Sequence, residues 1–66
     1  MAKFIPVTGF VNDEGDLSPE LNYINTVQIV SIYENKEYDV LMFEMSNKMV
    51  YYSRYPLEDF IEMFSD

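Results

Sequence analysis

Any catalytic chemistry in this chain would have to come from carboxylates, lysines or tyrosines. The 66 residues include no histidine and no cysteine, which removes the commonest general base and any thiol nucleophile. Two neighbouring carboxylates can act as acid and base when they are buried unequally. The adjacent pairs Asp13-Glu14 and Glu58-Asp59 both fall in segments where solvation is expected. With only two glycines, the chain has no glycine-rich phosphate loop. We therefore expect that the protein is not an enzyme, with no catalytic residues and no cofactor.

The acidic segment Asn12–Glu20 is a second place where chemistry could occur. A calcium-binding EF-hand loop needs oxygen ligands at alternating positions, a central glycine and a distant bidentate glutamate. Here the carboxylates and Gly15 are out of that register. We expect no metal site, and a solvated loop built from turn-forming residues. The carboxylates concerned are Asp13, Glu14, Asp16 and Glu20.

The charge balance limits the partners that the protein can have. Twelve acidic and four basic residues give a net charge of −8. This disfavours direct nucleic-acid binding, which depends on basic residues that neutralise phosphates, and it disfavours an anionic membrane surface. It suits a protein partner with a basic surface, or serves solubility alone. No apolar run approaches the length of a membrane span, no signal-peptide core is present and cysteine is absent, so we expect a cytoplasmic protein.

Tyrosines give the clearest indication of a partner-binding surface. Tyrosine is enriched at interfaces because it is large, stiff and amphipathic. The alternative is that about half of these residues only line the sheet, with their hydroxyls in water. Combined with an adaptable methionine and the acidic loop, they define the predicted partner-binding residues. These are Tyr33, Tyr51, Tyr52, Met42, Asp13, Glu14 and Asp16.

The spacing of apolar residues predicts a chain that is mostly β-strand. Two runs rich in aromatic and β-branched residues flank Ser46-Asn47 within Glu37–Arg54, which is the pattern of a β-hairpin. Lys3–Val11 is a further predicted strand. Pro6 should place it at a sheet edge or at a bend, and Gly9 should mark a bulge.

The segment Leu21–Asn35 and the C-terminal residues complete the predicted elements. Dense β-branching predicts a short strand at Tyr23–Asn25, an irregular step at Thr26–Gln28 and a longer strand at Ile29–Glu34. We expect the Asn25 side chain to hydrogen-bond nearby backbone at the step. A C-terminal helix over Tyr55–Asp66 is predicted from Pro56 at its start and from one apolar stripe. The stripe consists of Leu57, Phe60, Ile61 and Phe64.

Together these elements predict a single α+β domain spanning residues 1–66. We expect a small, twisted antiparallel sheet of four to five strands with the C-terminal helix packed on one face. A chain of this length buries only about 60% of the surface that its unfolded form exposes, so small domains need additional stabilisation. With disulfides excluded and apolar residues on both sides of the central hairpin, we expect the uncovered face to pair with a second copy in a homodimer.

The order of these segments resembles that of a widespread group of very small bacterial and phage proteins. Lys3-Phe4-Ile5-Pro6-Val7-Thr8 is followed by Tyr23-Ile24-Asn25 and Ile29-Val30-Ser31-Ile32, then by a hairpin and a short acidic helix. The flagellar FlbD-like family shares this layout, and the similarity covers most of the chain. The longer acidic loop and the larger number of tyrosines depart from the pattern. The resemblance implies no catalytic residues. For a phage-encoded member it implies a small accessory protein or a protein that blocks a host defence. The resemblance also implies that the cytoplasm is that of a bacterial or infected host cell.

The function predicted from the sequence is therefore non-enzymatic protein binding, by an accessory or inhibitor protein that occupies a host or defence protein. One alternative is an acidic mimic of DNA, which requires carboxylates in a row on one face. Another is a protein that sequesters a small signalling molecule, which requires a polar pocket although few basic residues are available to hold phosphates. A regulator of a bacterial machine such as the flagellum is a further alternative.

Overall fold

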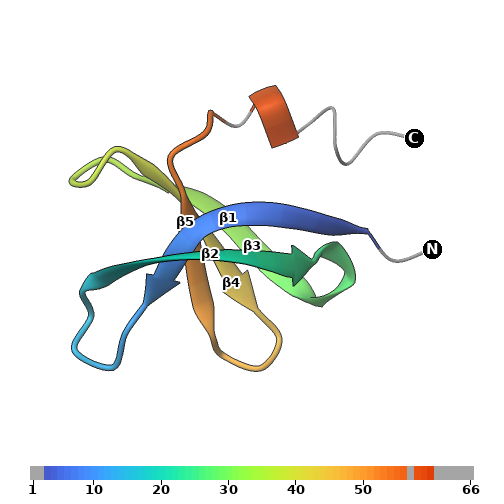
Figure 1. Cartoon of the computed structure of the whole chain (residues 1–66), viewed down its shortest axis with the longest axis horizontal. Helices are drawn as coiled ribbons and strands as arrows, with labels where there is room; N and C mark the ends of the chain where they lie inside the picture. The colour runs from blue at the N-terminus through green and yellow to red at the C-terminus, as the bar shows by residue number, and fades with distance from the viewer. Residues whose placement is uncertain (1–2, 57, 61–66) are drawn as a thin grey trace.

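The computed structural model describes residues 3–56 and 58–60 of the chain, and its main element is a five-stranded antiparallel sheet (Figure 1). The strand order is β2-β1-β5-β4-β3, so β2 and β3 form the two edges. This confirms the predicted antiparallel sheet at the upper end of the expected strand number. The strands are β1 (Phe4–Val11), β2 (Leu17–Asn25), β3 (Ile29–Asn35), β4 (Val40–Met45) and β5 (Val50–Ser53).

The predicted C-terminal helix is described only in part. The described part of the predicted C-terminal helix is one short turn at residues 58–60. Of the predicted apolar stripe, only Phe60 lies within the described residues, and Leu57, Ile61 and Phe64 lie outside them. The described part of the chain is therefore mainly β, with a small helical turn at residues 58–60. None of the described helical segments is long and apolar enough to cross a membrane.

The sheet bends between the β1–β2 hairpin and the strands β5, β4 and β3. These two halves are joined only by a short ladder between β1 and β5. The β1–β2 hairpin crosses in front of the strands β3, β4 and β5 (Figure 1). Only Gly9 and Phe10 of β1 pair with β5. Pro6 pairs with Tyr23 of β2 and lies beyond this ladder. At Pro6, β1 therefore pairs on one side only, which agrees with the predicted edge position. The missing N–H is tolerated there although β1 is central in the sheet order.

Gly9 lies at the predicted irregularity in β1. The register between β1 and β2 shifts between Val7 and Gly9, which confirms the predicted bulge. A Cβ atom at Gly9 would collide with the carbonyl oxygen of Ser18 and would lie 2.8 Å from the Tyr52 ring. The absence of a side chain at Gly9 therefore lets the Tyr52 ring lie directly on the β1 backbone.

The connection between the edge strands β2 and β3 has the irregular form that the sequence predicted. Thr26–Gln28 form a 3-10 helix, η1, as the predicted irregular step. The Asn25 side-chain oxygen accepts a hydrogen bond from the Val27 N–H at 3.0 Å, which confirms the expected local bond. β2 is longer than predicted because it begins at Leu17 and not at Tyr23. The predicted loop Asn12–Glu20 is correspondingly too long, since its last four residues belong to β2.

The central hairpin is present, but its first strand begins later than predicted and its turn is longer than the predicted Ser46-Asn47. Its first strand begins at Val40 because the Asn35 side-chain oxygen accepts hydrogen bonds from the Glu37 and Tyr38 N–H groups and closes a turn before it. The turn covers residues 46–49, in which the Lys48 N–H donates to the Met45 carbonyl at 3.0 Å. Lys48 adopts a positive φ of 72° in this turn.

Both faces of β4 are covered within the single chain, and Glu44 is the exposed residue of this strand. Val40 and Met42 belong to one apolar cluster with Tyr52, and partly buried Val11, Leu17 and Val50 pack against it. The expectation that one face of this hairpin stays open for a second copy is therefore wrong at β4, because the bent sheet supplies both covers. The other cluster comprises Ile5, Val7, Ile24, Leu41, Phe43, Met45 and Phe60.

Candidate functional site

Two of the residues predicted to bind a partner belong to the core. Tyr52 is 1% exposed and Met42 is 5% exposed. They lie directly opposite each other on β5 and β4, and the Arg54 guanidinium lies 5.9 Å from the centre of the Tyr52 ring. A partner could reach these two side chains only if the core opened. Their assignment to a binding surface is therefore corrected, and they act in packing.

The other two tyrosines differ in their exposure. Tyr51 is partly buried and packs against the cluster that contains Phe43. Tyr33 is 44% exposed and lies on β3 at the edge of the sheet. Of the predicted tyrosines, Tyr33 is thus the one whose ring is substantially available on the surface of the single chain.

The acidic residues of the predicted site lie together on the turn between β1 and β2. The Asn12 side-chain oxygen accepts hydrogen bonds from the Glu14 and Asp16 N–H groups, both at 3.0 Å. Gly15 has a φ of 85°, which closes the turn. Asp13, Glu14 and Asp16 are all exposed. This segment, called the acidic turn below, therefore presents three carboxylates to solvent from a backbone that hydrogen bonds hold in shape.

The same hairpin carries an apolar surface that the sequence reading missed. Phe4 is 64% exposed, Tyr23 is 62% exposed and Leu21 is 79% exposed. Tyr23 lies opposite Pro6, and Phe4 is two residues before Pro6, so these side chains share the face of the hairpin that points away from the core. The sequence signal for this surface was the alternation of Phe4 and Pro6 with Ile5, which is buried.

The hairpin surface is defined here as the acidic turn together with Phe4, Leu21, Tyr23 and the exposed Glu20. It runs the length of β2, whose nine residues span about 30 Å at the usual rise per residue. Carboxylates lie at one end and large apolar side chains toward the other. Such a surface is long enough for a standard protein–protein contact, which covers about 800 Å² on each partner.

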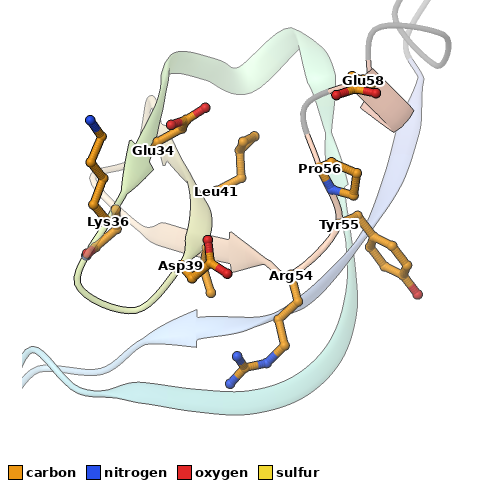
Figure 2. A pocket seen from close by; sticks show the side chains of 10 residues that line it. Glu34, Lys36, Asp39, Leu41, Arg54, Tyr55, Pro56 and Glu58 are labelled. Carbon is orange, nitrogen blue, oxygen red and sulfur yellow. The ribbon is translucent and has the colours of Figure 1, made fainter.

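A polar cleft lies beside the beginning of β4, near Val40 (Figure 2). Its volume is about 450 Å³, and it lies between the β3–β4 turn and the segment that follows β5. Three carboxylates line it, from Glu34, Asp39 and Glu58, against the cations of Lys36 and Arg54. The excess of negative charge disfavours a phosphate-bearing ligand. In the described part of the chain, no group of three or more carboxylates is arranged to hold a metal ion.

Comparison of the chain with models of known protein families, with curated protein sequences and with solved structures finds no match.

Proposed function

We propose that this protein is a non-enzymatic binding protein that docks on a positively charged protein through its hairpin surface. The observation that carries the proposal is the combination on one hairpin of three large apolar side chains, each more than 60% exposed, with an acidic turn whose backbone is hydrogen-bonded to the Asn12 side chain. Exposed apolar groups that are flanked by polar residues mark interaction sites. The partner would be occupied by contact, as for an accessory protein or an inhibitor of a host defence.

The two parts of the hairpin surface have different roles in this proposal. Tyr23, Phe4 and Leu21 would be buried in the contact, where aromatic side chains supply much of the binding energy. The acidic turn would lie at the rim, where charges mainly accelerate association with a basic surface. A net charge of −8 gives the whole protein the sign needed for such attraction.

The positions of the carboxylates bear on the alternative of DNA mimicry. The acidic turn follows Val11, close to the end of β4 that carries Glu44, as the pairing of Phe10 with Tyr51 and of Tyr51 with Phe43 shows. Glu37 and Asp39 belong to the turn at the other end of β4 (Figure 1). Carboxylates at opposite ends of the sheet do not form one row, so the described residues favour a protein partner.

Site-specific photo-crosslinking tests the proposal. A photoreactive phenylalanine derivative in place of Tyr23 should form a discrete adduct with a basic protein in a lysate of the cells in which this chain is naturally made. The same derivative in place of Tyr38, which is 45% exposed in the β3–β4 turn, is the matched control and should give no such adduct.

Salt provides the second part of the test. The adduct at position 23 should decrease as salt rises from about 50 mM to about 0.5 M, because exposed charges are then screened. Mass spectrometry of the excised band identifies the captured protein and its charge. Equal labelling at positions 23 and 38, or capture of an acidic protein at position 23, would contradict the proposal.

A further inference from the structure

The edge strand β3 is a second exposed surface, separate from the hairpin surface. In the described part of the chain it pairs with β4 alone. Val30 is 65% exposed, Tyr33 is 44% exposed and Ile32 is 36% exposed. An edge strand also carries a row of outward-pointing N–H and C=O groups that can pair with another strand.

The two sheet edges differ in how they are protected against such pairing. β2 contains Pro19, which has no N–H, and the charged Glu20, and the Tyr23 N–H lies 3.0 Å from the Asn22 side-chain oxygen. Proline and charge are common means of blocking an edge. β3 has no proline and no lysine, and its one irregularity, at Val30, is confined to its first residues. From Ser31 to Asn35 the strand is regular and open.

We propose that β3 pairs with β3 of a second copy of this chain, antiparallel across a two-fold axis beside Ile32. Each Ile32 then lies opposite its own copy, and each Tyr33 lies opposite Ser31 of the other chain, where a small residue leaves room for the ring. This register lays the whole of β3 beside the other chain, with the irregular Val30 opposite Glu34, and joins two five-stranded sheets into one continuous sheet. It also buries the exposed side chains of Ile32 and Tyr33, which are central in the strand.

Charge favours a second copy over a basic strand as the occupant. Residues 29–33 of β3 are all uncharged, so a lysine-rich segment would find no counter-charge along them. Glu34 is the only charged residue of β3. In the proposed register the two Glu34 residues are four positions apart along the ladder, or about 13 Å, which exceeds the screening length of about 8 Å at physiological salt. Because each chain carries a charge of −8, added salt should strengthen this association.

A charge-exchange experiment tests the register. Alone, Ile32→Lys and Ile32→Glu should each weaken the dimer by about tenfold or more, because each substitution places two like charges directly opposite each other. A one-to-one mixture of the two variants should recover a heterodimer with the wild-type mass. Sedimentation equilibrium from about 1 µM to about 1 mM covers the range expected of a small contact. Circular dichroism verifies that each variant is folded. The matched control is Leu21→Lys on the other edge, which should leave the dimer mass unchanged.

The wild-type chain gives an independent readout if the Ile32 variants do not fold. Amide resonances of residues 29–35 should shift with protein concentration and exchange more slowly when concentrated, while those of β2 should not. A monomer up to 1 mM (about the highest concentration used) in low and high salt would overturn the proposal. Weakening of association by salt, or failure of the two folded variants to recover a heterodimer on mixing, would overturn it as well. None of these outcomes depends on whether the hairpin surface binds a basic protein.

Discussion

Replacing Tyr52 by alanine is expected to remove most of the stability of the fold. Among the described residues its side chain is the largest of the fully buried ones, at 1% exposure, and it packs in a cluster with Val40 and Met42. Removing a buried aromatic ring costs about 3–5 kcal/mol. A domain of this size has roughly 5 kcal/mol of stability to lose. Circular dichroism during urea and thermal unfolding measures the loss.

Two tyrosine variants are the controls for this prediction. Tyr52→Phe keeps the ring and should cost no more than about 1.5 kcal/mol. Tyr33→Ala removes the same atoms from an exposed position, and its effect on the stability of the single chain should stay within about 0.5 kcal/mol. If Tyr52→Ala melted within a few degrees of the parent, the assignment of this ring to the core would be wrong. If Tyr52→Ala no longer bound a partner, the cause would be loss of the fold. Such a result would therefore give no information about an interface.

Phe60→Ala should cause the second large loss of stability. Phe60 is 0% exposed, and its ring meets the ring of Phe43 edge to face, with centroids 5.2 Å apart. The substitution removes this contact and leaves a cavity over the β4 face, at a cost of about 3–5 kcal/mol. The matched control is Glu58→Ala, which alters an exposed residue of the same turn. If Phe60→Ala and Glu58→Ala had equal midpoints in urea, the C-terminal turn would not cover the core.

Local turn chemistry is the part of the fold that could be predicted from the sequence. Asn25 closes the step into η1, and Gly9 marks the bulge in β1, because each effect depends on a residue and its immediate neighbours. The beginning of β2 could not be placed in this way. Ser18, Pro19 and Glu20 are typical of loops, but they form strand here because β2 is an edge, where a missing N–H is tolerated.

The candidate site was predicted less well than the fold because its exposure depends on contacts between distant strands. Tyr51 and Tyr52 are neighbours that point to opposite faces, and nothing local decides which ring is buried. Tyr52 is buried because its strand pairs with β1 at Gly9, a contact between residues more than forty positions apart in the chain. The exposed side chains of Phe4 and Tyr23 follow from the same crossing of the β1–β2 hairpin over the other strands (Figure 1). The acidic turn was found correctly as a solvated segment because its turn residues act locally.

Binding kinetics of the purified partner across a salt series would test the proposed function most directly. Two variants separate the roles of charge and apolar contact: one with Asp13, Glu14 and Asp16 changed to their amides, and Tyr23→Ala. Both alter exposed residues and should remain folded. The first should slow association and reduce its dependence on salt, because rim charges steer the encounter. The second should accelerate dissociation by about thirtyfold, equivalent to about 2 kcal/mol for a central aromatic residue. Wild-type association that is independent of salt, together with unchanged dissociation of Tyr23→Ala, would contradict the proposal that the hairpin surface binds a basic protein.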